Sequence, residues 1–172
     1  VENLLFITRI ENGTMQLNLQ PEMIEDIFRE AIHHLGRNKR KHNISMHLED
    51  DLLMANMDAR LIIQVLVNLI NNAIKYTPEN SNISLNARRV EDKILIEVQD
   101  DGNGVLHPDQ LFEMFYTENN RGGDTRRGMG LGLSLCKSII QSHGGTIWVE
   151  NVTPHGACFK FVLDAVEVKL YE

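Results

Sequence analysis

Amide side chains recur along one face of an otherwise apolar segment at residues 61–76. Steps of three and four residues separate its polar members, which are Gln64, Asn68, Asn71, Asn72 and Lys75. Such spacing places side chains on one side of a helix. Asparagine is a poor helix former, so this stripe indicates either a ligand site or an unusual solvated face. Amide oxygens suit Mg²⁺, which shares its coordination with phosphates and water. From the stripe alone, both interpretations stay open.

A carboxylate and two glycines follow the strand that we expect at residues 93–99, in the sequence DDGNGV. The Asp100 carboxylate is able to accept hydrogen bonds from an exocyclic amine, such as that of adenine. Gly102 and Gly104 allow the backbone to approach a flat ligand closely. A plain Asp-Gly turn has the same residues, and this motif alone favours that simpler reading.

Three alternating glycines, Gly128, Gly130 and Gly132, precede an amphipathic segment. Free N–H groups and the dipole at such a helix start attract anions, although a helix-initiating loop without a ligand is the alternative. No Lys-Ser/Thr pair follows, as a P-loop requires, and Leu133 stands where the Rossmann spacing needs glycine. Together, the three motifs predict a nucleotide site, with amides for a metal, a carboxylate for the base and glycines for phosphates.

Apolar periodicity predicts the elements that must position these residues. We expect helices over residues 1–12, 21–40, 58–76 and 130–142, and strands over 44–48, 52–56, 82–89, 93–99, 146–151 and 157–163. Asp58 is expected to cap its helix. Helices and strands are interspersed without strict alternation, which favours an α+β fold, a two-layer sandwich whose helices cover one face of a mixed β-sheet. The polar stretch over residues 102–128 is long for a compact domain, as is typical of a functional lid.

Composition narrows the classes of function. The net charge of −7, from 17 basic and 24 acidic residues, argues against a general nucleic-acid binder. The basic run over residues 37–41 is expected to be solvated. Cys136 and Cys158 form no disulfide framework or zinc motif, which fits a reducing, cytoplasmic compartment. The chain begins in mid-pattern without methionine, so we expect a piece of a longer protein.

These motifs resemble, in the same order, those of the GHKL ATPase superfamily, and within it the ATP-binding (HATPase_c) domains of two-component sensor histidine kinases. The resemblance covers roughly residues 20–163. NLINNAIKYTP resembles the N box, DDGNG the D-x-G-x-G box, LFEMFY the F box and GMGLGLSL the G2 box. The leading NLLFITRIENG resembles the end of a dimerisation helix, and with GACF it resembles the potassium-responsive KdpD branch.

The resemblance implies a Bergerat fold that binds ATP and Mg²⁺. It implies that residues 1–13 end a dimerisation helix, and that residues 14–172 form the catalytic domain with a lid at about 105–127. It assigns Asn72 to Mg²⁺, Asn68 and Lys75 to phosphates, Tyr76 to the nucleotide and Asp100 to the adenine N6 amine. The remaining implied nucleotide contacts are Gly102, Gly104, Arg127, Gly128, Gly130, Leu131 and Gly132.

Two departures from the wider superfamily bear on the reaction. ATPases of the superfamily carry a water-activating Glu at the position of Asn68, so this site should resist hydrolysis and keep the γ-phosphate for a protein acceptor. Kinases place their acceptor histidine in an H-E/D-x-x-x-P-like motif, and none of the seven histidines here has that setting. We therefore expect the acceptor in a missing upstream segment.

The implied partners follow from this family. They are the protein's own dimerisation and phosphoacceptor domain, a response regulator, and a second copy in a full-length homodimer. Contact with a membrane is expected only through missing segments, which makes this the cytoplasmic domain of a membrane-anchored bacterial protein. The alternative is a non-kinase module that senses nucleotide, or binds a partner, and signals through lid closure.

Overall fold

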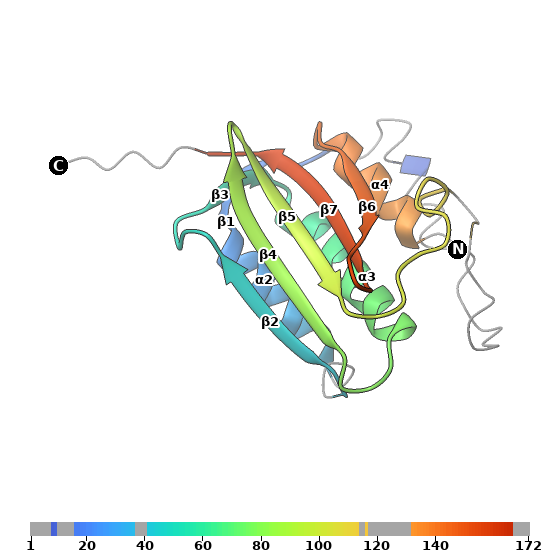
Figure 1. Cartoon of the computed structure of the whole chain (residues 1–172). Coiled ribbons are helices and arrows are strands. Elements are labelled where there is room, and N and C mark those ends of the chain that lie inside the picture. Colours follow the sequence, from blue (N-terminus) through green and yellow to red (C-terminus); the bar gives the residue numbers. More distant parts are fainter. Residues whose placement is uncertain (1–7, 10–15, 37–40, 114–115, 117–131, 167–172) are drawn as a thin grey trace.

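The computed structural model describes residues 8–9, 16–36, 41–113, 116 and 132–166 (Figure 1). Its elements, in chain order, are β1 (Gln20–Met23), α2 (Ile24–His34), β2 (Asn43–Leu48), β3 (Met54–Met57), α3 (Ala59–Tyr76), β4 (Asn82–Val90), β5 (Lys93–Asp100), α4 (Gly132–Ser142), β6 (Ile147–Asn151) and β7 (Ala157–Asp164). Of the expected helix over residues 1–12, only Thr8 and Arg9 are described, and both are helical. Among the described residues, no helix is long and apolar enough to cross a membrane.

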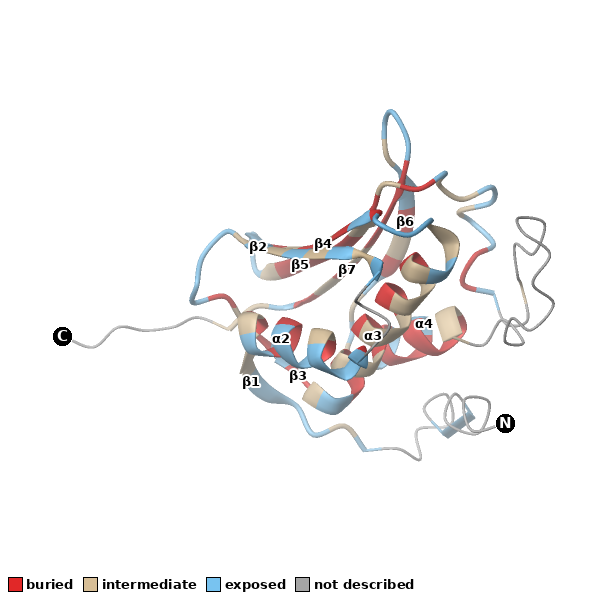
Figure 2. Cartoon of the chain, turned by 90° about the horizontal axis from the view of Figure 1, so that it is seen from below, coloured by how far each residue is buried: buried red, intermediate tan, exposed pale blue. Residues whose placement is uncertain are grey.

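The main sheet has five strands in the order β2-β4-β5-β7-β6. β2 runs parallel to β4, whereas the other neighbouring pairs are antiparallel. Helices α2, α3 and α4 all lie on one side of this sheet, as the two perpendicular views show (Figures 1 and 2). The predicted α+β sandwich with a mixed sheet covered on one face is therefore confirmed.

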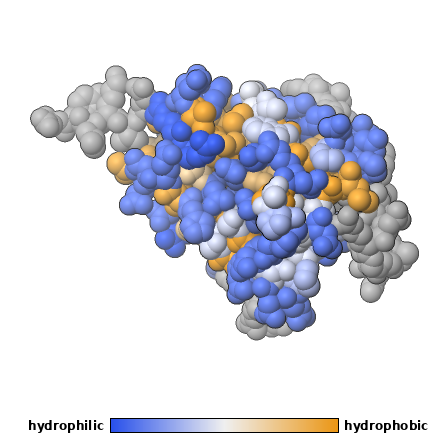
Figure 3. Space-filling view, in the orientation of Figure 1, coloured by the Kyte–Doolittle hydropathy of each residue, from blue (hydrophilic) through white to orange (hydrophobic). Residues whose placement is uncertain are grey.

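The two faces of the sheet differ in polarity because side chains alternate along each strand. Ile83, Leu85 and Ile96 point into the fully buried core beneath the helices. The opposite face carries polar residues such as Asn86, and it is mostly hydrophilic (Figure 3). On that face, Lys160 lies 3.0 Å from the Glu150 carboxylate.

The start of the domain differs from the prediction. Residues 20–23 form a strand that pairs antiparallel with β3, whereas a helix was expected from Pro21. Proline suits both a first helical turn and a strand of this small two-stranded sheet, and the pairing partner lies too far along the chain to be seen locally. α2 then begins at Ile24, whose N–H donates to the Leu53 carbonyl at 3.0 Å. It ends at His34, before Gly36 at φ +59°.

Asp58 occupies the N-cap position of α3, but the prediction that its side chain caps the helix is wrong. Its carboxylate instead accepts a hydrogen bond from the backbone N–H of Asn18 at 3.1 Å and one from Arg60 Nε at 3.2 Å. These partners compete with the first-turn N–H groups of α3 for the same oxygens. Asp58 therefore fastens the segment before β1 to the start of α3.

α3 is the central helix of the covering layer, and its apolar side is fully enclosed. Leu61, Ile62, Leu66, Leu69 and Ile70 are 2% exposed or less. The prediction of a buried helix here is confirmed. Its amide residues occupy the remaining side.

Candidate functional site

Asp100 is the last residue of β5 and is only 8% exposed. Its Oδ1 accepts hydrogen bonds from the Gly102 N–H at 2.9 Å and from the Ala157 N–H at 3.2 Å. Burial raises the pKa of this carboxyl, and the two N–H donors act in the opposite direction. Both bonds use Oδ1, so Oδ2 has no hydrogen-bond donor within the described part of the chain. The carboxyl is fixed in orientation and keeps one oxygen for a ligand.

The two glycines after Asp100 are required by contacts inside the protein. A Cβ on Gly102 would lie 2.7 Å from Thr77 Cγ2 and 3.2 Å from Asp100 Oδ1. Gly104 has φ +81°, and a Cβ there would lie 2.5 Å from the side-chain oxygen of Asn151. Only glycine avoids these overlaps. The loop after β5 is therefore pressed against the end of α3 on one side and the end of β6 on the other.

The amide stripe lies on α3 as predicted. Asn68, Asn71 and Asn72 are each half-buried, and the Asn72 amide makes no hydrogen bond with another described residue. Asn68 Nδ2 is buried and lacks a hydrogen-bond partner among the described residues. A buried unsatisfied donor costs about 1–3 kcal/mol, so this amide favours a group that accepts its hydrogen bond. Phosphate oxygens are acceptors of that kind.

Asn68 also lies next to Cys136, a residue of α4. Burial raises the pKa of the Cys136 thiol to about 12, and the nearby Asn68 amide, which does not reach hydrogen-bond geometry with the sulfur, acts more weakly in the opposite direction. The thiol itself is directed at the Val65 carbonyl, 3.8 Å away. A thiol with this pKa is not a nucleophile at neutral pH. Cys136 therefore serves packing between α3 and α4.

The last turn of α3 meets the loop after Asp100. Lys75 Nζ lies 5.9 Å from the centre of the Tyr76 ring, a cation–π distance. Thr77 Oγ1 donates to the Ala73 carbonyl at 2.7 Å and accepts from His42 Nε2 at 2.9 Å. Thr77 in turn packs on Gly102. The structure therefore brings Lys75, Tyr76 and the Asp100 loop to the same end of α3.

The glycine-rich motif and much of the expected lid lie outside the described residues. These include Arg127, Gly128, Gly130 and Leu131, whereas Gly132 is described as the first residue of α4. Part of the segment expected to form the lid is described, and at Phe112 it is anchored in the core. Phe112 is 8% exposed and packs edge-on against Phe159, with ring centres 5.9 Å apart.

A family model with the description "Histidine kinase-, DNA gyrase B-, and HSP90-like ATPase" matches residues 57–167, which is more than half of the chain. The chain belongs to this family. Within it, the chain is an ATP-binding catalytic domain of the sensor histidine kinase type. The matched range contains the stripe on α3, Asp100 and the glycine-rich motif. The family resemblance predicted from the motifs is confirmed.

Curated relatives of this ATP-binding domain are sensor kinases. Sensor protein KdpD of Clostridium acetobutylicum is 35% identical over 163 residues, 94% of this chain and 18% of the relative. The adaptive-response sensory kinase SasA of Synechocystis is 34% identical over 169 residues, 95% of this chain and 43% of the relative. The chain thus spans less than half the length of either relative. The KdpD match agrees with the branch indicated by the sequence.

Solved structures agree with this family. The catalytic domain of histidine kinase ThkA superposes with a TM-score of 0.74 at 28% identity, over 86% of this chain and 95% of that domain. ThkA in complex with the response regulator TrrA superposes with a TM-score of 0.76 at 26% identity, covering 96% of this chain and 48% of that one.

The sequence motifs gave no role to the turn between β6 and β7, and the structure places this turn against the Asp100 loop. Asn151 exchanges two hydrogen bonds with Val105, and the His155 ring donates to the Asp101 carbonyl at 2.7 Å. In the sequence, Asn151 is visible only as a polar residue at the end of a strand, before a Pro-His-Gly turn. That pattern does not distinguish a residue that holds a loop from a solvated one.

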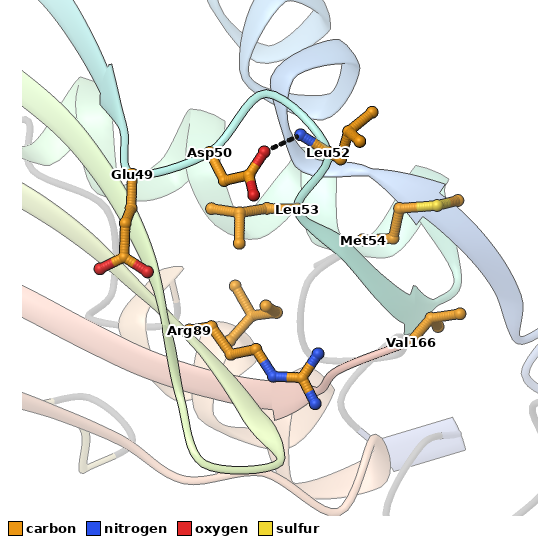
Figure 4. Close-up of a pocket in the computed structure, with 8 residues that line it drawn as sticks. Glu49, Asp50, Leu52, Leu53, Met54, Arg89 and Val166 are labelled. Atoms are coloured by element: carbon orange, nitrogen blue, oxygen red, sulfur yellow. Dashed lines mark hydrogen bonds between the residues drawn. The ribbon is translucent and has the colours of Figure 1, made fainter. Parts of the chain in front are cut away.

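A pocket of about 330 Å³ lies elsewhere in this ATP-binding domain (Figure 4). Its lining includes Glu49, Asp50, Leu53 and Arg89. Arg89 pairs with Ile94 across the β4–β5 ladder, whereas Ile83 pairs with Asp100 at the other end. The pocket is therefore remote from Asp100, and it is not the predicted nucleotide site.

Proposed function

We propose that this domain, in its full-length protein, presents ATP·Mg²⁺ to a histidine that attacks the γ-phosphate, after which the phosphoryl group passes to an aspartate of a response regulator. The observation that carries the proposal is the geometry of Asp100. Two backbone donors hold its Oδ1, which leaves Oδ2 to accept a hydrogen bond from the adenine N6 amine. A carboxylate fixed in this way discriminates adenine from guanine, which has a carbonyl at the equivalent position.

The phosphate and metal side of the site is assigned to α3 and the start of α4. Asn72 would hold Mg²⁺, and Asn68 and Lys75 would contact phosphates, with Tyr76 against the nucleotide. The residues of α3 fit this role, because Asn72 is half-buried without a described partner and Asn68 Nδ2 needs an acceptor. When bound there, Mg²⁺ would supply positive charge to offset that of the phosphates. The remaining proposed contacts are Gly102, Gly104, Arg127, Gly128, Gly130, Leu131 and Gly132.

The protein's contribution to phosphoryl transfer is then positioning, with no proton abstraction from water. Asn68 stands where superfamily ATPases carry Glu, and an amide accepts no proton at neutral pH. We propose as acceptor a histidine on a dimerisation helix, whose end corresponds to residues 1–13, in a homodimer. Residues 14–172 would then be the catalytic domain, on the cytoplasmic side of a membrane-anchored bacterial protein. The ThkA–TrrA complex supports the response regulator as the second partner.

Calorimetric titration of this chain with ATP, GTP and ADP, each with and without Mg²⁺, tests the proposal. We expect micromolar to millimolar binding of adenine nucleotides and none of GTP, with Asp100→Asn abolishing the ATP signal in a folded sample. Absence of ATP binding by the folded, unmodified chain would refute the proposal. Binding without phosphorylation of an added cognate dimerisation domain would favour the nucleotide-sensing alternative.

A further inference from the structure

The end of β6 holds the loop after Asp100 through one side chain, that of Asn151. Its Oδ1 accepts a hydrogen bond from the Val105 N–H at 2.7 Å. Its Nδ2 donates to the Val105 carbonyl at 3.1 Å. Both backbone groups of Val105 are thus paired with one amide, as they would be with a neighbouring strand. A strand-like pairing of this kind fixes the path of the backbone at Val105.

The same amide also constrains the residue before Val105. Gly104 is in the left-handed region at φ +81°, and the space that a Cβ would need is occupied by Asn151 Oδ1 at 2.5 Å. A second contact closes the loop from the other side, because a Cβ there would also meet the Gly156 carbonyl at 3.1 Å. Asn151 therefore fixes both the conformation of Gly104 and the exit of the chain toward the F box.

The flanking residues show that this part of the fold faces the base-reading carboxylate. Ala157, at the start of β7, donates directly to Asp100 Oδ1 at 3.2 Å, and the His155 ring donates to the Asp101 carbonyl at 2.7 Å. The segment over residues 151–157 thus contacts the loop over residues 100–105 at three separate points. Asn151 is an exposed residue, as is His155, so core packing does not require its amide.

We propose that Asn151 is a positioning residue for nucleotide recognition, acting through Val105 and Gly104 on the loop that carries Asp100 and Gly102. This inference rests on the proposed function. In this proposal Asn151 acts through the backbone of Val105 and needs no contact of its own with the nucleotide. Its effect should fall on the adenosine part of the nucleotide, because the residues that it holds adjoin Asp100 and not the amide stripe.

The test compares Asn151→Ala with Asn151→Asp in the complete chain. Asn151→Ala removes both hydrogen bonds, so we expect ATP, ADP and adenosine to bind more weakly by a common factor on the order of tenfold. Amide exchange at Val105 should also accelerate in the unliganded protein. Asn151→Asp keeps an acceptor for the Val105 N–H, and it should restore Val105 protection and part of the affinity.

Asn86→Ala is the matched control, because Asn86 is a strand amide whose one side-chain hydrogen bond within the described part of the chain goes to Ser84 Oγ, at 3.3 Å, and not to the Asp100 loop. It should bind all three ligands as the unmodified chain does. Unchanged affinities in Asn151→Ala, alongside lost binding in Asp100→Asn, would overturn the inference and leave the proposed function intact. A loss confined to ATP would also overturn it, because the effect would then lie at the phosphates. If the unmodified chain binds no ATP, the proposed function is refuted, and the inference about Asn151 is refuted with it.

Discussion

His143 Nε2 accepts a hydrogen bond from the backbone N–H of Asp58 at 3.0 Å, joining the end of α4 to the start of α3. The other ring nitrogen, Nδ1, lies 2.8 Å from the Ile139 carbonyl and must donate to it. The two contacts together fix one tautomer of a neutral imidazole. Burial lowers the pKa of His143, and the weaker attraction of the Asp58 carboxylate acts in the opposite direction.

Folding stability should therefore fall in mild acid. A proton added to Nε2 would face the Asp58 N–H and break that hydrogen bond. The pKa of His143 in the folded protein lies below its unfolded value of about 6.5. The stabilisation from neutral His143 is therefore complete above about pH 6.5 and is lost as the pH falls below this value. Denaturant unfolding between pH 8 and pH 5 should show this loss. His143→Gln should be less stable at pH 8 by about 1–3 kcal/mol, with a flatter pH dependence. Parallel pH curves for the two proteins would contradict the assignment.

Asp100→Asn should stabilise the unliganded protein while removing ATP binding. Burial raises the pKa of this carboxyl, so the folded state disfavours its ionised form. The protonated Asp100 carboxyl therefore contributes stability that is present below the pKa of the unfolded chain. This contribution is lost as the pH rises through the pKa of the folded protein. An amide still accepts the Gly102 and Ala157 N–H bonds without carrying charge. Thermal unfolding at pH 7 should shift upward by a few degrees without ATP, and ATP should add nothing. A lower melting temperature would show that the charge itself holds the loop.

Gly104→Ala should destabilise the domain by about 1–3 kcal/mol, because the left-handed backbone disfavours a side chain and the new Cβ would meet Asn151. Gly132→Ala is the matched control for the unliganded fold, since a Cβ there meets nothing within 4 Å. Alanine at this helix position should be neutral or slightly stabilising. Urea unfolding of both variants without nucleotide measures the difference. Equal stabilities would mean that the loop relaxes freely around residue 104.

Asn72→Ala should abolish the Mg²⁺ dependence of ATP affinity and leave adenosine binding unchanged. The amide is half-buried and uncommitted within the described structure, as a metal ligand requires. Asn71→Ala is the matched control, because it removes the neighbouring amide of the same stripe. Titrations with and without Mg²⁺ should separate the two variants. If both variants show the same Mg²⁺ dependence, the stripe is a solvated helix face and not a metal site.

The chain alone should neither label itself with phosphate nor hydrolyse ATP at a useful rate. General-base assistance is worth about 10²–10⁴-fold in rate, and the Asn68 amide supplies none. A cognate dimerisation domain carrying the acceptor histidine, added in trans, should become phosphorylated in an acid-labile form. Asn68→Glu is expected to introduce weak hydrolysis. Robust ATPase activity of the unmodified chain would point instead to a conformational ATPase.

Local patterns were sufficient for features set within a few positions, such as the strand that ends at Asp100 and the buried helix α3. The nucleotide contacts of Asp100 and Gly102 stay a prediction, and the hydrogen bond between these two residues was not foreseen. The strand at Gln20–Met23 was missed because its partner, β3, lies in a separate part of the sequence. Asp58 was expected to cap α3, but its carboxylate accepts a hydrogen bond from the N–H of Asn18, 40 positions earlier in the chain. The part played by Asn151 depends on a contact across 46 positions, which no local pattern encodes.

The hydrogen bond from the Asn18 N–H to Asp58 connects the chain before β1 to the N-terminal end of α3. The chain before β1 is attached there, and the helix spans about 27 Å from that point to its far end. Asn72 and Tyr76 lie in the last two turns of the same helix. The attachment of the preceding segment and the amide residues of the stripe are therefore joined by one continuous, buried helix.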